Sequence, residues 1–323
     1  MKRRWLTFLT LLQLSVIQAA ASDPTTDCQV EIMILGAGQD AGAPQIGNND
    51  DPGWKDTSLA LWPTSLALID DNSNQRFLFE ATPAIGAQLQ LLASQLERHP
   101  SRLGIDGIFL THAHIGHYAG LMYLGHEAAS TNRMPVYAMP RMQQFLETNG
   151  PWSQLVEFAN IQLRSLEQRK AISLSPGLSV TPLLVPHRDE FSETVGYLIN
   201  ANDVSVLFIP DIDSWEDWQQ AFNVNILDLL QSVDHAFLDA TFYDDDELPG
   251  RDMTKIPHPR IHASMQLFEA VADLDTHITF IHMNHTNPVR FSDSPEHQEI
   301  KRRGFDVARR GDRICLDRNP NDS

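Results

Sequence analysis

The sequence predicts an α/β protein built as one layered domain, and three observations support this prediction. Apolar, β-rich runs alternate with amphipathic helical stretches from residue 30 onward. A chain of 323 residues can bury a large core as one α/β domain or two smaller ones, and it contains no internal repeat. Several apolar runs end in a histidine or an aspartate, which places ligand-type side chains at the carboxyl ends of strands.

The first 21 residues have the pattern of a secretory signal peptide. Basic residues at positions 2–4 precede an apolar core from Trp5 to Ile17, and residues 19–21 are alanines. The apolar core is shorter than the roughly 20 residues that a membrane span needs. We therefore expect a mature domain over residues 22–323, in the periplasm or secreted, with no membrane contact after cleavage.

The formal charge of −18 at pH 7 argues against nonspecific nucleic-acid binding, because an acidic surface repels the phosphate backbone. The expected partner is a small-molecule substrate, and the sequence does not indicate an oligomeric state. The only cysteines, Cys28 and Cys315, lie just before the first expected strand and in the last one. An oxidising compartment favours a disulfide between them, provided that the fold brings them within bridging distance.

Nine apolar runs rich in β-branched and aromatic residues are the expected strands. They are Val30 to Leu35, Ser65 to Ile69, Arg76 to Glu80, Gly107 to Leu110, Leu183 to Val185, Gly196 to Ile199, Ser205 to Ile209, His235 to Leu238 and Ile278 to Ile281. Apolar spacing or capping residues predict helices over Ala84 to Arg98, Tyr118 to Ala129, Trp215 to Leu230, and from Ser294-Pro295-Glu296 to Gly304.

Two long stretches without a clear pattern, Gln39 to Thr64 and Tyr243 to Arg260, are typical of lids or binding walls. The first begins within a glycine-rich loop, Gly36 to Gly42, that follows a strand as in dinucleotide-binding proteins. The glycine spacing differs from that motif, and Pro44 prevents an immediate helix. We interpret this loop as a tight turn near the ligand-bearing edge.

Five apolar runs lead to a potential ligand, and these side chains should converge on one edge of the fold. They are His112, His187, Asp211, Asp239 and His282. Imidazoles and carboxylates are the ligands that zinc-like and iron-like cations take outside thiolate sites.

His112 and His114 are two residues apart, so both rings project to the same side of extended backbone and can share one cation. His187 is the expected third ligand, and a solvent position would stay open for chemistry. His117 and His282 would hold a second cation, with Asp211 between the two. We expect His117 at the start of a helix, where the helix dipole disfavours imidazolium and keeps the ring neutral.

This order of ligands resembles the metallo-β-lactamase superfamily, whose signature is H-x-H-x-D-H followed by a histidine, a bridging aspartate and a final histidine. The chain has His112-Ala113-His114-Ile115-Gly116-His117, then His187, Asp211 and His282. The resemblance spans most of the mature chain and implies an αββα sandwich with the metal site along one edge of the sheets. It leaves His285 open as an alternative final ligand.

Within that superfamily the chain is most similar to proteins of the pyrroloquinoline quinone biosynthesis protein B type. The residues that carry this resemblance are Leu35-Gly36 through Gly42-Ala43-Pro44-Gln45, Glu80 to Ile85, and Ile281 to Pro288. The segment Asp239 to Phe242 resembles one in the phosphodiesterase and transfer-RNA-processing branches, where an acid orients a catalytic histidine. His258 or His262 would be that histidine here.

The chain departs from these patterns in three ways. Gly116 replaces the signature aspartate, so we expect one tight cation site and a second that is weak or empty. If the second position merely lacks this ligand, Gly116→Asp should raise the metal content. The quinone-biosynthesis proteins tend to keep the aspartate-histidine pair and lose the paired histidines, the reverse of this chain. The cysteines that usually follow the glycine-rich loop are replaced by Asn48-Asn49-Asp50. These differences argue against assigning the activity of the quinone-biosynthesis proteins to this chain from the resemblance alone.

The leading interpretation is an exported metal-dependent hydrolase of an ester, phosphodiester or lactone-like substrate. Zinc, or else iron or manganese, would activate water, and Asp211 would hold or orient it. His258 would donate a proton to the leaving group, oriented by Asp239. The alternatives are an iron-dependent oxygenase or cofactor-biosynthesis enzyme, and a non-catalytic metal-binding protein.

Overall fold

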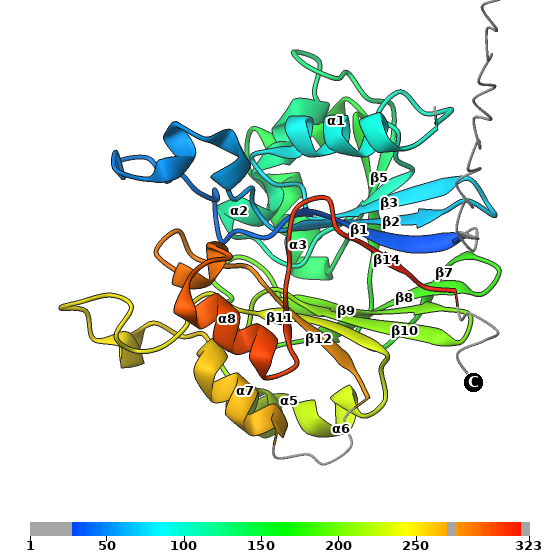
Figure 1. Ribbon diagram of the computed structural model, residues 1–323. Coiled ribbons are helices and arrows are strands. Elements are labelled where there is room, and N and C mark those ends of the chain that lie inside the picture. The colour runs from blue at the N-terminus through cyan, green and yellow to red at the C-terminus, as the bar shows by residue number, and fades with distance from the viewer. Residues whose placement is uncertain (1–27, 98, 270–274, 318–323) are drawn as a thin grey trace, which may run out of the picture.

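The computed structural model describes residues 28–97, 99–269 and 275–317. These form two seven-stranded sheets that pack face to face, with helices on both outer sides (Figure 1). The expected αββα sandwich is therefore confirmed. The expected signal peptide, residues 1–21, lies outside the described residues. Within the described ranges, no helix is long and apolar enough to cross a membrane.

The first sheet has the strand order β14-β1-β2-β3-β4-β5-β6. Its strands are β1 (Val30–Gly36), β2 (Ser65–Asp70), β3 (Gln75–Phe79), β4 (Gly107–Phe109), β5 (Met134–Ala138), β6 (Ile161–Ser165) and β14 (Arg313–Cys315). Strands β3 to β6 are parallel, so their carboxyl ends lie at one edge of the sheet.

The second sheet has the order β13-β12-β11-β10-β9-β8-β7. Its strands are β7 (Ile172–Ser175), β8 (Leu178–Leu184), β9 (Val195–Ala201), β10 (Val204–Ile209), β11 (His235–Asp239), β12 (His277–Ile281) and β13 (Asp306–Val307). Strands β10 to β13 are parallel, so their carboxyl ends lie together at one edge of the second sheet.

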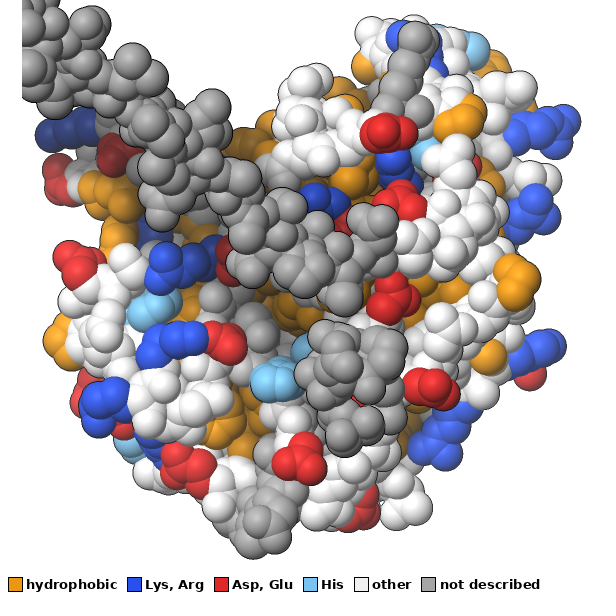
Figure 2. Space-filling view, turned by 45° about the vertical axis from the view of Figure 1, so that its right-hand side comes forward, with side chains coloured by type: hydrophobic (Ala, Val, Ile, Leu, Met, Phe, Trp, Pro, Cys, Tyr) orange, Lys and Arg blue, Asp and Glu red, His pale blue; other side chains and the backbone are white. Residues whose placement is uncertain are grey.

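Helices cover the outer face of each sheet (Figure 1). Over the first sheet lie α1 (Ile85–Gln95), α2 (Ile115–Tyr118), α3 (Pro140–Thr148) and α4 (Trp152–Glu157). Over the second lie α5 (Trp215–Phe222), α6 (Ile226–Leu230), α7 (Ile261–Glu269) and α8 (Pro295–Arg302). The surface shown in Figure 2 carries acidic and basic side chains interspersed with hydrophobic ones.

Aromatic side chains fill the space between the sheets. The ring centroid of Phe79 on β3 lies 5.4 Å from that of Tyr197 on β9 and 6.0 Å from that of Phe208 on β10. Phe109 on β4 stacks on Phe79 at 5.1 Å, and all four residues are buried. Burying each such side chain contributes about 1.5–3 kcal/mol. This packing fixes the two sheets relative to each other, and with them the strand ends that carry the site.

All nine expected strands are present, with boundaries shifted by a few residues. The nine ranges do not include β5, β6, β7, β13 or β14, although Cys315, on β14, was expected in the last strand. Strand β5 contains Pro135 and alternates between buried and half-buried residues, while β6 and β7 are the last strands of their sheets and are largely exposed or half-buried. Such edge strands lack the continuous apolar run that identified the others.

Two helix predictions are wrong in part. The helix expected over Tyr118 to Ala129 is instead the four-residue α2 followed by a 3-10 helix, Ala119–Leu124. Gly120 packs here so closely that a Cβ would lie 2.1 Å from the Thr82 carbonyl oxygen. The helix expected over Trp215 to Leu230 is broken into α5 and α6 by Asn223, whose φ of 53° is left-handed.

A disulfide joins Cys28 and Cys315, whose Cα atoms are 5.8 Å apart, which resolves the pairing that the sequence left open. Cys28 lies two residues before β1, and Cys315 ends β14, its antiparallel neighbour. The bridge spans 287 residues of sequence, so it restricts the unfolded chain strongly.

We expect Cys28→Ser/Cys315→Ser to lower the free energy of unfolding by about 2–4 kcal/mol, because the unfolded state regains entropy. Urea unfolding of the double variant and of the wild type measures this difference. Wild-type protein unfolded under a reducing agent should match the double variant. Equal stability of the variant and the oxidised wild type would contradict the expectation.

Candidate metal centre

The candidate site lies where strand ends from the two sheets meet. His112 follows the end of β4 by three residues, Asp211 follows β10 by two, and His282 directly follows β12. His187 follows β8, and Asp239 is the last residue of β11. The loops of residues 39–64 (blue) and 243–260 (yellow) extend from the same side of the sandwich (Figure 1).

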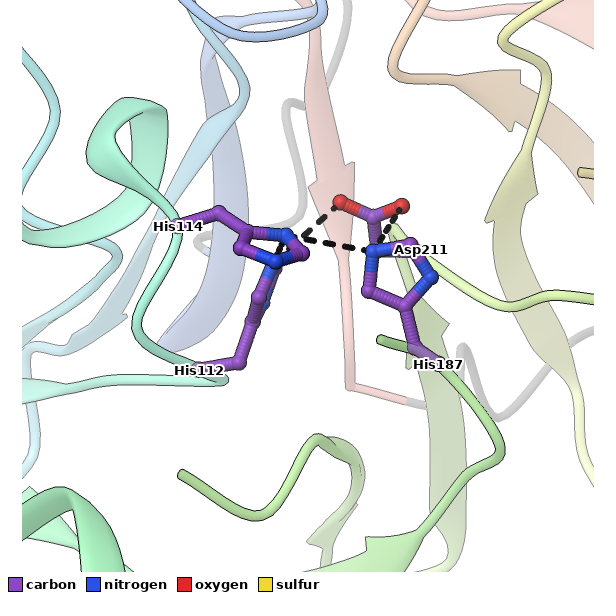
Figure 3. A group of neighbouring side chains, drawn as sticks. All are labelled: His112, His114, His187 and Asp211. Carbon is purple, nitrogen blue, oxygen red and sulfur yellow. Dashed lines mark hydrogen bonds and ion pairs between the residues drawn. The ribbon is translucent and has the colours of Figure 1, made fainter. Parts of the chain in front are cut away.

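Three imidazoles and one carboxylate face each other at a first cation position (Figure 3). His114 Nδ1 lies 2.8 Å from His112 Nε2 and 3.2 Å from His187 Nε2. Asp211 Oδ2 is 3.5 Å from His112 Nε2, and its Oδ1 is 3.3 Å from His187 Nε2. One donor atom from each residue lies within 4.8 Å of the others, so the structure gathers these four predicted residues.

The outer nitrogen of each ring has a partner of its own, which determines which nitrogen faces the centre. The pairs are His112 Nδ1 with Thr111 Oγ1 at 2.8 Å, His187 Nδ1 with Asp213 Oδ1 at 2.8 Å, and His114 Nε2 with Glu190 Oε2 at 3.4 Å. When the outer nitrogens carry the protons, the inner lone pairs point at the shared position, as cation binding requires.

A second group consists of His117, His282 and the same Asp211. Asp211 Oδ2 lies 3.2 Å from His117 Nε2 and 3.4 Å from His282 Nε2, so the carboxylate bridges the two positions. His285, the alternative final ligand, is not in either group; its carbonyl oxygen accepts a hydrogen bond from Arg290.

Buried polar atoms that have no hydrogen-bond partner in the described part of the chain lie at the centre. Asp211 Oδ1 and His282 Nε2 are both in this state, and the two residues are 4% and 1% exposed. A buried carboxylate surrounded by imidazoles is expensive unless a cation or protons compensate it. Because the inner atoms are imidazole nitrogens and carboxylate oxygens, the residues fit a divalent cation such as zinc or iron.

Most of the imidazoles are held neutral. Burial and neighbouring imidazoles lower the pKa values of His112 and His114, and burial is the main reason that the pKa of His282 falls to about 4. Burial raises the pKa of Asp211, but the surrounding imidazoles outweigh it and hold that pKa well below its usual range. Neutral rings around an ionised carboxylate are the protonation states that cation binding needs.

His117 is different, and the expectation that a helix dipole keeps it neutral is wrong. It lies in the last turn of the four-residue α2 rather than at the start of a longer helix. Burial lowers its pKa, but the charge of Glu80, 3.3 Å from Nδ1, and that of Asp211 raise it to about 10. A cation at the second position has to displace this proton, which weakens binding there.

His258 and Asp239 form a pair beside the first position. His258 Nδ1 lies 2.8 Å from Asp239 Oδ2 and 3.5 Å from Asp211 Oδ1. Burial lowers the pKa of His258, but the adjacent Asp239 carboxylate raises it overall. The other candidate, His262, lies on α7, where its Nε2 is 2.8 Å from Gln266 Nε2. The acid-oriented histidine of this site is therefore His258.

Sequence reasoning missed the roles of Glu80 and Thr241. Glu80 directly follows β3, is fully buried and has a φ of 74°, so the same strand-end signal that identified the histidines could have found it. Thr241 Oγ1 donates to Asp239 Oδ1 at 2.7 Å and lies 3.1 Å from both His258 Nδ1 and His282 Nδ1. It links the second position to the histidine-acid pair.

The two long loops are partly fixed by ion pairs. A buried pair joins Arg290 Nη1 to Asp51 Oδ2 at 2.7 Å and holds the loop of residues 39–64 against the segment that follows β12. In the acidic run of residues 244–247, Asp245 pairs with Arg260 at the surface. Glu247 is more enclosed, and burial raises its pKa to about 7.

Gly116 is in contact with the glycine-rich loop. A Cβ at this residue would lie 2.4 Å from the main-chain oxygen of Asp40 and 2.6 Å from its Cα. These neighbours are backbone atoms, so they cannot move aside as a flexible side chain would. The glycine is therefore required by the position of Asp40, which the sequence alone did not show.

Gly116→Asp is consequently expected to destabilise the protein by about 1–3 kcal/mol, because the new side chain collides with backbone. This argues against the simple gain in metal content expected from the sequence. Thermal unfolding and metal analysis measure both effects. Gly86→Asp is a matched control, since nothing lies within 4 Å of a Cβ there. Full stability with an additional bound cation in Gly116→Asp would contradict the prediction.

Comparison with known families identifies the fold independently of the site. The family described as beta-lactamase superfamily domain matches residues 75–293, which include every residue of both cation positions. Coenzyme PQQ synthesis protein B of Pseudomonas fluorescens is 26% identical over 318 residues, which cover 88% of this chain and 99% of that protein. Its counterpart in Methylococcus capsulatus is 25% identical, with the same coverage.

Solved structures share the architecture. Zinc-bound PqqB from Methylobacterium extorquens has a TM-score of 0.73 at 23% identity, covering 88% of this chain and 99% of that chain. A diphosphatase from the PhnP family has a TM-score of 0.60 at 21% identity, covering 88% of this chain and 96% of that one. At these identities the structural likeness shows the fold alone.

Proposed function

Because this chain belongs to the beta-lactamase superfamily, we propose that it is a metal-dependent enzyme that acts on a small molecule in a biosynthetic reaction. The observation that carries the proposal is the convergence of His112, His114 and His187 on the Asp211 carboxylate. The likeness to coenzyme PQQ synthesis protein B extends over 88% of the chain and favours a role in cofactor synthesis over general hydrolysis. An oxidation by O₂ at iron is the first reaction to test.

A divalent cation at the first position would supply Lewis acidity toward an oxygen of the substrate or of water. The chain's own residues position the ligands and move the proton. The Asp213 carboxylate contacts Nδ1 of His187 and fixes the orientation of that ring. The Asp239 carboxylate contacts Nδ1 of His258 in the same way. The Nε2 atom of His258 has no hydrogen-bond partner among the described residues, so it is the atom that would exchange a proton with the substrate.

Hydrolysis is the second candidate, and the His258–Asp239 pair favours it. A histidine oriented by a buried acid can protonate a leaving group, which ester or phosphodiester cleavage needs and many oxidations do not. The expected export also remains part of the proposal, supported by the pattern of residues 1–21. Cell fractionation of the full-length protein tests it.

One purification tests the proposal and separates the two reactions. The protein is isolated without oxygen, its zinc, iron and manganese are quantified, and it is assayed for oxygen consumption and against a panel of phosphodiesters, lactones and esters. Bound iron with oxygen uptake supports the biosynthetic oxidation, whereas bound zinc with cleavage of a panel member supports hydrolysis. A folded protein that takes up no divalent cation refutes both.

A further inference from the structure

The second cation position has fewer donors than the first. It contains His117 Nε2, His282 Nε2 and one oxygen of Asp211, which it shares with the first position. Gly116, which directly precedes His117, has no side chain to add. An oxygen donor from elsewhere in the chain would complete the group.

His282 has the arrangement that a ligand of a cation needs at this position. Its Nδ1 lies 3.1 Å from Thr241 Oγ1, which itself donates to Asp239, so Nδ1 carries the proton of the neutral ring. The lone pair of Nε2 then faces Asp211 Oδ2 at 3.4 Å, with no hydrogen between them. Nε2 is buried and has no hydrogen-bond partner among the residues that the structure describes. Two acceptors in this arrangement repel each other unless a cation or a proton lies between them, and a divalent cation can bind both atoms at once.

Asp40 occupies the space that a side chain at residue 116 would use. Its main-chain oxygen is 2.4 Å and its Cα 2.6 Å from the Cβ position of Gly116. In an aspartate the carboxylate oxygens lie about 2.4 Å from Cβ by standard bond lengths. The backbone of Asp40 therefore lies as close to the Cβ position of residue 116 as the carboxylate oxygens of an aspartate side chain would.

The Asp40 side chain is free to serve as a ligand. Asp40 is exposed, and within the described ranges its carboxylate has no hydrogen bond or ion pair. It is the only acidic residue between Gly36 and Asn48. Its φ of 49° is unusual for a residue with a side chain, although Asp and Asn tolerate it best.

The loop that carries Asp40 is anchored to the second position. Gln39 N donates to the carbonyl oxygen of Met283 at 2.8 Å, and Met283 directly follows His282. Thr64 N donates to the Gly38 carbonyl oxygen at 2.8 Å, which also fixes the start of this loop against the residue that precedes β2. These two hydrogen bonds place Gly38 and Gln39, which precede Asp40, beside the segment that follows His282.

We propose that Asp40 supplies the oxygen donor that residue 116 lacks, so that Asp40, His117, Asp211 and His282 form a second cation site. This inference rests on the proposed function, since Asp211 belongs to both sites. The second site is weaker than the first because Asp40 is solvent-exposed and has to turn its carboxylate inward.

Zinc and manganese titrations of the metal-free protein test the proposal, with stoichiometry from native mass spectrometry and manganese binding from electron paramagnetic resonance. The wild type is expected to bind two equivalents, the second more weakly. Asp40→Asn should lose at least about tenfold in affinity for the second equivalent only. Asp50→Asn is the matched control on the same loop, exposed and without a hydrogen-bond partner among the described residues; it should behave as wild type.

Asp40→Gly is the second variant, because it removes the oxygen altogether and fits the positive φ. Undiminished binding of the second equivalent in Asp40→Gly overturns the proposal, as does a wild type that binds one equivalent at saturating metal. In both cases the first equivalent still binds, so the proposed function survives. Failure of the wild type to bind even one equivalent would instead refute the proposed function.

Discussion

Asp211→Asn is expected to remove bound metal from both cation positions. The Asp211 carboxylate lies within 3.5 Å of five imidazoles, those of His112, His117, His187, His258 and His282. The substitution keeps the shape of the side chain but removes the negative charge that both positions share. Metal content by mass spectrometry should fall from at least one equivalent to a small fraction of one, and turnover should fall with it.

The same variant should change the stability of the metal-free protein. His117 would lose one of the two carboxylates that raise its pKa, so a buried imidazolium would lose part of its compensation. Leaving a buried charge without its partner typically costs about 3–5 kcal/mol. Asp203→Asn, in the exposed turn between β9 and β10, is the control. It should change neither the metal content nor the stability of the metal-free protein. Wild-type metal content in Asp211→Asn would refute the assignment of a shared carboxylate.

His258→Ala is expected to retain metal and lose about 10²- to 10⁴-fold in turnover, the usual contribution of a positioned proton donor. His258 is absent from the first group of ligands, and its contact with Asp211 is the longer of its two carboxylate contacts. Metal content of the variant and its turnover of the substrate identified by the screen measure the two effects separately.

Added imidazole should restore part of the turnover of His258→Ala, because its protonated form can enter the space that the ring leaves and donate the proton. A merely structural role for His258 would give no such rescue. His262→Ala provides the reciprocal comparison, since that ring contacts Gln266 instead of Asp239. A loss of turnover in His262→Ala alone would reverse the assignment of the two histidines.

The sequence predicted the site best where a histidine or aspartate side chain follows a buried strand. His112, Asp211 and His282 follow long apolar runs, so their convergence could be predicted from the rule that strand ends share an edge. The central strands were found for the same reason, because burial on both faces produces a continuous apolar run. The outer strands β6 and β7 were missed because half-exposed segments carry no such run.

Contacts between distant loops were not predictable. Nothing in the sequence places Asp40 against Gly116, and the glycine was interpreted only as a missing ligand. The helix dipole argument for His117 failed because His117 lies in the last turn of the short α2 and because the carboxylate of Glu80, which follows β3, lies 3.3 Å from its Nδ1. Glu80, whose charge raises the pKa of His117, was identified only as a strand end and as part of a resemblance.

The first cation position takes His112 and His114 from the first sheet, and His187 and Asp211 from the second. A bound ion is therefore a cross-link between the amino-terminal and carboxyl-terminal halves of the chain. Because only the folded chain assembles these four groups, binding stabilises it by mass action, and the effect grows with the free ion concentration. The supply of metal in the surroundings would then govern how long the protein survives proteolysis, in addition to how fast it works.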